Sequence, residues 1–116
     1  MSNSDPCPEL RTQIRALQQQ RRTIESKLLQ PQTLRTGSLV ERYLAGREGK
    51  RGRPAYYLSR SQQGRSKLTY IKKEELATVR RHCDAYRAFQ QNWTAWRQLT
   101  AALEDCWKRL QEAQSR

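Results

Sequence analysis

The stretch from Lys73 to Gln114 contains neither glycine nor proline, the two residues that most often interrupt an α-helix. Its apolar residues recur every three or four positions, as they do along one face of a helix. Glu74 and Glu75 place negative charge in the first turn, where the helix dipole favours it. A helix over 73–114 would be about 63 Å long, so it dominates the predicted architecture. Its apolar stripe consists of Leu76, Val79, Cys83, Tyr86, Phe89 or Gln90, Trp93, Trp96, Leu99, Leu103, Trp107 and Leu110.

A second, shorter helix is predicted over residues 8–30. Pro8 suits its first turn, where the missing N–H is harmless, and Pro31 ends it. We expect the two helices to pair antiparallel, with the end of the shorter helix and the start of the long helix both beside the middle segment of the chain. Because residues 8–30 would span only about 35 Å, the long helix from roughly Trp96 onward would lack a partner in its own chain. The apolar residues of the shorter helix follow a heptad repeat and are Leu10, Ile14, Leu17, Ile24 and Leu28.

The middle of the chain has a different character. Aromatic and β-branched residues there predict strands, and Gly64 suits the positive φ of a hairpin turn. We expect Tyr56 and Tyr70 to lie in the core with Leu58 and Leu68, because the sheet has few other apolar residues. The predicted strands are 38–44, 55–60 and 67–71, joined by a Gly- and Arg-rich loop at 45–54 and a turn at 61–65.

The predicted fold class is therefore α+β. An N-terminal helix is followed by a small three-stranded antiparallel sheet and a long C-terminal helix, and the two helices pair as an antiparallel coiled-coil-like hairpin. The expected segments are a disordered tail (1–7), the N-terminal helix (8–33), a basic β-meander (34–72) and the long helix (73–116).

The formal net charge is +12, and residues 35–81 carry +9 of it. A charge of this size repels itself in the folded state unless a polyanion neutralises it, and nucleic acid is the commonest such partner. An evenly basic surface would spread the charge along the chain, so its concentration favours a binding face. The expected nucleic-acid-binding residues are Arg42, Arg47, Lys50, Arg51, Arg53, Arg60, Arg65, Lys67, Lys72, Lys73, Arg80 and Arg81.

The motif Arg51-Gly52-Arg53-Pro54 contains the core of an AT-hook, an extended peptide that lies in the minor groove of A/T-rich DNA. A basic loop that contacts phosphates without distinguishing sequences is the alternative interpretation, and the residues leave both open.

In the predicted hairpin, basic residues alternate with tyrosines. Such a two-stranded ribbon fits a major groove, and tyrosines can also stack on unpaired bases.

The C-terminal part of the long helix is rich in tryptophan, which typically anchors cores and interfaces. Because this part is expected to lack a partner in the chain, we predict that it forms an interface. A homodimer of two antiparallel arms is the simplest arrangement, and docking on a larger protein or folding back of residues 95–116 are alternatives. The expected interface residues are Trp93, Trp96, Leu99, Leu103, Trp107 and Leu110.

Catalytic and metal chemistry find little support in the sequence. His82 is the single histidine, and Cys7, Cys83 and Cys106 are too widely separated for a zinc-binding spacing. We expect no enzyme activity, no catalytic residue, no metal and no cofactor. Unpaired cysteines, a polar N-terminus and the lack of a long apolar run indicate a cytoplasmic protein that does not bind membranes.

Part of the chain resembles a known but uncharacterised family. The residues that carry the resemblance are Gly37 to Tyr43 (G-S-L-V-E-R-Y), Tyr56 to Ser59 (Y-Y-L-S), Thr69 to Leu76 (T-Y-I-K-K-E-E-L) and the later Tyr86-Arg87. Over about 34–90 the chain is similar to short bacterial proteins that are often encoded beside transposase genes. The resemblance implies an accessory role in a mobile element and no particular activity. Many relatives have cysteines in the loop after the first strand, and this chain has none there.

The sequence thus predicts a non-enzymatic nucleic-acid-binding accessory protein, with duplex DNA slightly favoured over structured RNA. A transposase or another nucleoprotein is its expected protein partner. The alternative is an adaptor or subunit that docks a larger nucleoprotein complex through its tryptophan-rich helix.

Overall fold

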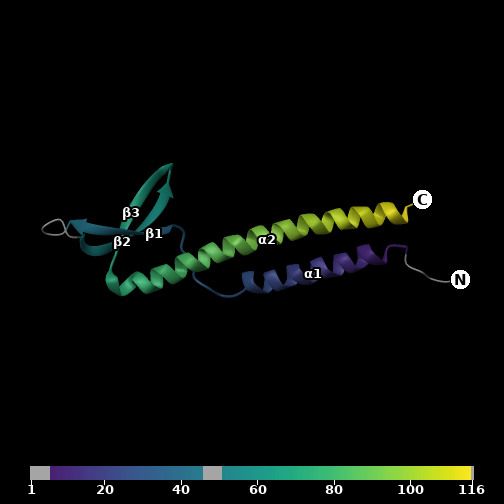
Figure 1. Cartoon of the computed structure of the whole chain (residues 1–116), viewed down its shortest axis with the longest axis horizontal. Coiled ribbons are helices and arrows are strands. Elements are labelled where there is room, and N and C mark those ends of the chain that lie inside the picture. The colour runs from purple at the N-terminus through teal and green to yellow at the C-terminus, as the bar shows by residue number, and fades with distance from the viewer. Residues whose placement is uncertain (1–5, 46–50, 116) are drawn as a thin grey trace. The chain divides into compact units, whose positions relative to one another are not determined.

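The computed structural model describes residues 6–45 and 51–115. Two helices and three strands follow one another in the predicted order (Figure 1), and the α+β fold class is confirmed. A 3₁₀ helix, η2, precedes the long helix. The elements are α1 (Pro8–Leu28), β1 (Ser38–Ala45), β2 (Arg51–Gln62), β3 (Arg65–Ile71), η2 (Lys73–Glu75) and α2 (Leu76–Gln114).

The chain divides into two compact units. The first, called the helix unit, comprises Met1–Gln30 and Phe89–Arg116, so it contains α1 and the larger part of α2. The second, called the β unit, is Pro31–Ala88 and contains the sheet, η2 and the first turns of α2.

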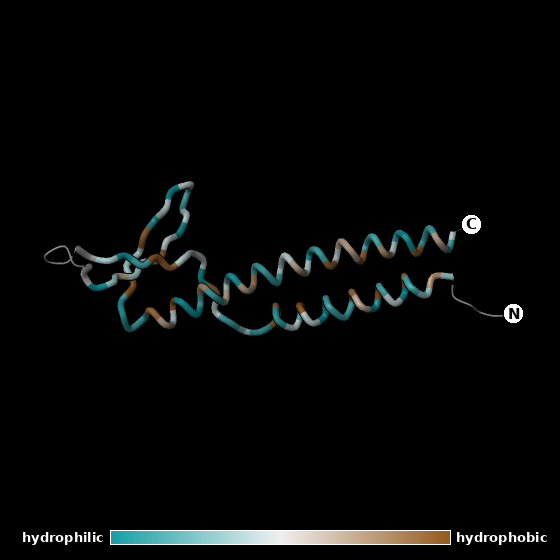
Figure 2. Tube along the Cα trace, viewed as in Figure 1, coloured by the Kyte–Doolittle hydropathy of each residue, from teal (hydrophilic) through white to brown (hydrophobic). Residues whose placement is uncertain are grey.

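In the helix unit, α1 and α2 pair antiparallel through an apolar core. Arg11 hydrogen-bonds Gln114, and ten residues further along α1 the guanidinium of Arg21 donates to Thr100 Oγ1 at 3.5 Å. Residue numbers therefore rise along α1 as they fall along α2. In Figure 2 hydrophobic residues recur along the otherwise hydrophilic α1. The core consists of Cys7, Ile14, Leu103, Cys106 and Leu110, with Leu10 and Leu17 packed against it.

The expectation that α2 lacks a partner from Trp96 onward is wrong. Leu103 and Leu110 are only 3% and 5% exposed, because α1 covers this far part of α2. The prediction assumed that α1 ends beside the sheet. Residues 29–37, which separate α1 from β1, can span about 30 Å when extended, so the register of the helix pair is set by the apolar stripes. Of the expected tail, Cys7 belongs to the core and residues 1–5 lie outside the described part.

The sheet has the strand order β1-β2-β3, with both neighbouring pairs antiparallel. The β2–β3 turn contains only Gln63 and Gly64, at φ 51° and 78°. Two consecutive positive φ values are the signature of a two-residue hairpin turn whose twist matches that of the strands. The predicted positive φ at Gly64 is confirmed, and the connection is shorter than expected.

The loop predicted over 45–54 is wrong for residues 51–54, which belong to a strand. β2 begins at Arg51, and Pro54 lies opposite Tyr43 of β1. The pairing of β2 with β3 begins only at Tyr56, so the start of β2 has a strand on one side alone. Proline lacks an N–H and is tolerated in a strand where no neighbour needs that donor. Residues 46–50 lie outside the described part of the chain.

One face of the sheet packs against the start of α2. Leu58, Ile71, Val79 and Cys83 form its buried core, flanked by Leu39, Tyr56 and Leu76. The predicted core positions of Tyr56 and Leu58 are confirmed.

Leu68 and Tyr70 are exposed instead of buried, so their predicted core positions are wrong. They lie opposite Ser59 and Tyr57. Directly paired residues of an antiparallel sheet share a face, so both belong to the face that α2 does not cover.

The segment before β1 is held against the β unit by two hydrogen bonds. The backbone N–H of Arg35 donates to the His82 carbonyl at 3.1 Å, and Arg60 Nε donates to the Thr36 carbonyl at 3.0 Å. Gly37 follows with φ 112°, in close contact with β2. A side chain at this position would meet the Ser59 carbonyl oxygen at 2.7 Å, so only glycine fits.

Among the helices of the described residues, none offers the long apolar stretch that a bilayer crossing requires.

Candidate nucleic-acid interface

The two units differ sharply in charge. The β unit contains 14 basic and 5 acidic side chains, for a net charge of +9, whereas the helix unit contains 9 and 6, for a net charge of +3. Every one of the expected nucleic-acid-binding residues belongs to the β unit. The folded chain therefore keeps the predicted basic segment together as one compact body.

Several of these basic side chains are exposed on the strands and on the turns that follow them. Arg42 lies on β1, Arg53 on β2, and Arg65 and Lys67 on β3. The exposed Lys72 and Lys73 follow β3, and the exposed Arg81 lies on α2. Arg47 and Lys50 lie outside the described residues, and Arg51 is described only as a backbone position of β2.

Arg60 and Arg80 have contacts inside the β unit. Arg60 donates the hydrogen bond to the Thr36 carbonyl, and the Arg80 guanidinium lies over the Tyr56 ring at 6.0 Å from its centroid. A cation above an aromatic ring is attracted by the ring quadrupole. Replacing either arginine would therefore disturb the fold as well as the charge, so neither is a clean probe of binding.

The exposed arginines and lysines of the sheet have no neutralising partners in the described structure. Arg87 forms an exposed ion pair with Asp84 at 3.9 Å. Within residues 6–45 and 51–115, no acidic partner is recorded for the side chains of Arg42, Arg53, Arg65 or Lys67. These four cations are available to an anionic ligand.

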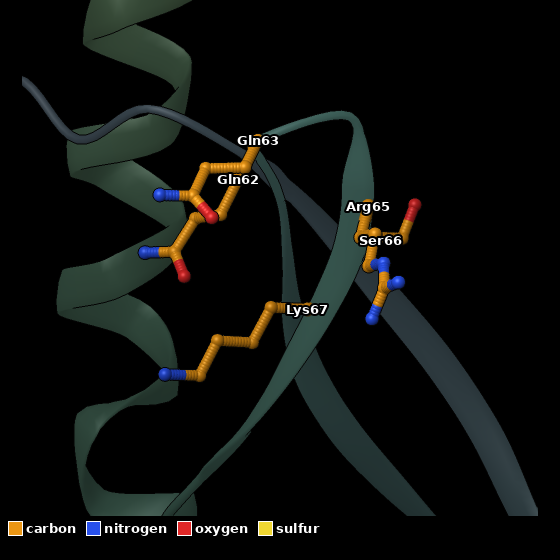
Figure 3. A pocket seen from close by; sticks show the side chains of 5 residues that line it. All are labelled: Gln62, Gln63, Arg65, Ser66 and Lys67. Atoms are coloured by element: carbon orange, nitrogen blue, oxygen red, sulfur yellow. The ribbon is translucent and has the colours of Figure 1, made fainter.

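The tip of the β2–β3 hairpin is polar and basic. Gln62, Gln63, Arg65, Ser66 and Lys67 surround a surface depression of about 660 Å³. In Figure 3 the side chains of Gln62, Gln63 and Lys67 extend to one side of the hairpin, and Arg65 extends away from them. Long hydrogen-bonding and cationic side chains therefore project from the hairpin in more than one direction.

The uncovered face of the sheet carries a pair of tyrosines, Tyr57 and Tyr70, of which the sequence prediction placed Tyr70 incorrectly in the core. We call it the outer face and define it by Val40, Arg42, Tyr57, Leu68 and Tyr70. The rings of Tyr57 and Tyr70 meet edge to face, with centroids 5.8 Å apart and planes at 68°. The dipeptide Gln63-Gly64 was the signal that could have found this pair, because a two-residue turn centred there sets Tyr57 opposite Tyr70.

The expected interface residues of α2 fall into two groups. Leu103 and Leu110 lie in the core, and Leu99 is half-buried. Trp93 stacks on the half-buried Trp96, with ring centroids 5.2 Å apart and planes at 5°. Trp93 and Trp107 remain 40% and 50% exposed. The structure therefore assigns Leu103 and Leu110 to the helix pair and leaves two tryptophans at the surface.

The described residues contain no group of three or more histidine, cysteine, aspartate or glutamate side chains that could hold a metal ion. Cys7, Cys83 and Cys106 are buried free thiols, and the first and last of them belong to the core of the helix unit.

No curated protein and no solved structure shows significant similarity to the chain. A family model described as a domain of unknown function does match, over residues 14–81. The match includes most of α1, the three strands and the first turns of α2, which is more than half of the 116 residues. The chain belongs to this family of domains of unknown function, DUF6788.

Proposed function

We propose that this protein is a non-enzymatic nucleic-acid-binding protein that grips a phosphate backbone through its β unit. The observation that carries the proposal is the set of exposed strand cations, Arg42, Arg53, Arg65 and Lys67, for which the described residues provide no acidic partner. In a unit with a net charge of +9, a polyanion relieves the repulsion among them.

The shape of the β unit supports the same ligand. A two-stranded ribbon has a width that a major groove admits, and contacts from arginine and lysine to phosphates fix a protein on nucleic acid without reading its sequence. Arg65 and Lys67 lie at the end of such a ribbon, while Arg42 and Arg53 lie on the other strands. Duplex DNA or structured RNA is the proposed ligand, with DNA slightly favoured.

Phosphate contact is favoured over the AT-hook for Arg51-Gly52-Arg53-Pro54. A hook needs an extended backbone that is free to lie along the groove floor. In this chain Arg51 and Pro54 lie opposite Ala45 and Tyr43 in the β1–β2 pair. The strand pairing therefore occupies one side of the backbone that a hook would present to the groove.

The test compares two double variants with the same change in formal charge. Arg65→Ala with Lys67→Ala removes two cations from the hairpin, and Arg97→Ala with Lys108→Ala removes two exposed cations from the helix unit. Fluorescence anisotropy of a labelled duplex, measured over a range of salt concentrations, gives the affinity and its salt dependence. Each phosphate contact that is lost lowers the slope of log K against log salt by about 0.9. We expect the hairpin variant to lose nearly two units of slope.

The helix-unit variant should keep most of its affinity and slope. If the two double variants weaken binding equally, the net charge of the whole chain is responsible and no localised face exists. If neither variant changes the binding of DNA or RNA, the proposal is wrong.

A second candidate function is that of an adaptor that docks a larger nucleoprotein complex through α2. The observation that favours it is the exposure of Trp93 and Trp107, because tryptophan is enriched at the energetic centres of interfaces. Salt distinguishes the two functions, since an apolar interface changes little when salt rises whereas phosphate contacts weaken steeply.

The proposed cellular role is that of an accessory to a transposase or similar machine in the bacterial cytoplasm, and it rests on the resemblance carried by residues 37–43, 56–59 and 69–76. The expected homodimer stays a prediction. Its motivation was an apolar stripe on α2 that was expected to be exposed, and α1 covers that stripe.

A further inference from the structure

We propose that the β unit holds one unpaired nucleobase in a recess at the open end of its sheet. The inference rests on the proposed nucleic-acid binding and deepens it, because it names the form of nucleic acid that the site prefers.

The recess exists because β2 is longer than β3. Pairing between these strands ends at Tyr56 and Ile71, after which the chain turns away through η2 into α2. The start of β2 consequently has β1 on one side and no strand on the other. A depression of about 530 Å³ lies there, lined by Arg53, Pro54, Ala55, Tyr56, Tyr57, Tyr70, Ile71, Lys73 and Leu76.

The lining combines apolar and aromatic side chains. The buried Ala55 and Ile71 contribute apolar surface. Tyr57 and Tyr70 of the outer face contribute their rings. Tyr70 is 62% exposed, which leaves its ring available to a ligand. Because the two rings meet at 68°, a flat ligand stacked on one of them presents its edge to the other.

The charged residues of the recess select an anionic ligand. Arg53 and Lys73 line it and are exposed, and no acidic residue is among its lining residues. A nucleotide offers what these features require, namely a planar face for an aromatic ring and a phosphate within reach of the cations. Base–aromatic stacking of this kind tolerates any base, since every base has a π-face.

The stacking requires a base that is outside a double helix. Within a duplex both faces of each base are covered by its neighbours, so only the edges are accessible in the grooves. A base in a single strand, a bulge or a frayed end exposes its face and can enter the recess at little cost in unstacking. The recess therefore favours nucleic acid with at least one unpaired nucleotide.

The test measures three labelled probes by fluorescence anisotropy: a DNA duplex, the same duplex with one bulged nucleotide, and the single strand alone, with the RNA versions in parallel. Tyr70→Ala removes the exposed ring, and Tyr70→Phe keeps the ring and removes only the hydroxyl group. Stacking on one base corresponds to a loss of roughly five-fold or more. We expect Tyr70→Ala to lose this much on the bulged and single-stranded probes and to lose less than two-fold on the duplex.

Tyr70→Phe should bind all three probes as the unchanged chain does. Because Tyr70 is exposed, the alanine variant should keep its fold, which circular dichroism checks. An equal loss on the duplex and the bulged probe, or no loss on any probe, would overturn the inference.

The Arg65→Ala, Lys67→Ala variant distinguishes this failure from a failure of the proposed function. If it still lowers duplex affinity and salt slope while Tyr70→Ala changes nothing, only the base recess is wrong. If the unchanged chain binds none of the probes at low salt, both proposals fail.

Discussion

The helix unit and the β unit have cores of the same kind but surfaces of different kinds. Each core is a small cluster of aliphatic side chains and buried cysteine, with Leu103 in one and Leu58 in the other. The helix unit has a net charge of +3 and the β unit has +9. Each unit therefore has a core of its own, while most of the excess positive charge belongs to the β unit.

The aromatic residues follow the same division. All three tryptophans lie in residues 89–116 of the helix unit, and all five tyrosines lie in the β unit. Tryptophan fluorescence therefore reports on the helix unit alone. Amide hydrogen exchange of β1, β2 and β3 reports on the other unit, because exchange resolves local opening from global unfolding. The two readouts make the comparison between the units measurable.

The largest expected effect comes from Leu103→Ala in the core of the helix unit. Removing a buried leucine side chain costs about 2–5 kcal/mol, since both burial and packing are lost. We expect the tryptophan-detected urea transition to shift by this amount, with much less change in the exchange of the β-unit amides.

Leu29→Ala is the matched control, because Leu29 is 82% exposed, and it should change stability by no more than about 0.5 kcal/mol. An equal loss of protection in β1–β3 on Leu103→Ala would show that the two units unfold together.

The next effect comes from Gly37→Ala in the β unit. The new Cβ would lie 2.7 Å from the Ser59 carbonyl oxygen and 2.9 Å from Arg60 Cγ, at a φ of 112° that side chains rarely adopt. Backbone strain alone costs about 1–3 kcal/mol, and the contact with a strand carbonyl adds to it. We expect the β-unit amides to lose about 2–4 kcal/mol of protection, while the tryptophan transition stays in place.

Gly64→Ala separates the two causes. Gly64 also has a positive φ, 78°, but nothing lies within 4 Å of the added Cβ. Its cost should be only the conformational one, about 1–2 kcal/mol. If the two alanine variants prove equally destabilising, the contact with Ser59 contributes nothing and the position of Gly37 in the structure is wrong.

The sequence predicted the helices well because their signals are local. The apolar spacing of α1 and α2, and the lack of glycine and proline in α2, depend on no distant contact. The register of the pair was mispredicted because a heptad-like stripe offers similar apolar partners at several offsets. Leu10 can meet a leucine near either end of α2, and only the whole set of contacts selects Leu110 and its neighbours.

The errors in the sheet have a different cause. A shift of one residue in register moves every side chain of a strand to the other face. The turn was expected over 61–65 but contains only Gln63 and Gly64, and Tyr70 was predicted on the wrong face. The Arg51-Gly52-Arg53-Pro54 motif has the composition of a loop, and its strand conformation comes from pairing with β1. The recess exists because β3 ends at Ile71, opposite Tyr56, while β2 already begins at Arg51. No motif in the sequence marks that difference in length.

The basic site was predicted as a segment but not as a surface. Net charge identifies the β unit without any structure, since 14 of its side chains are basic. The sequence could not show that Arg60 and Arg80 have contacts within the fold, or that Arg42, Arg65 and Lys67 remain exposed.

The smallest expected effect is a gain in stability from Gln63→Asn at the hairpin tip. Gln63 has a φ of 51°, which costs a glutamine more than an asparagine, whose short side chain tolerates the left-handed region. Asparagine followed by glycine is also the preferred pair for a two-residue hairpin turn. We expect a gain of about 0.5 kcal/mol in the protection of the β2 and β3 amides.

The side chain of Gln63 is exposed, so the core of the unit stays as it is. The proposed phosphate binding through Arg65 and Lys67 should be unaffected, because both cations keep their places in β3. The tryptophan transition should not move. A shift of that transition would mean that the stability of the hairpin is transmitted to the helix unit, and a loss of protection would mean that the turn does not have two consecutive positive φ values in solution.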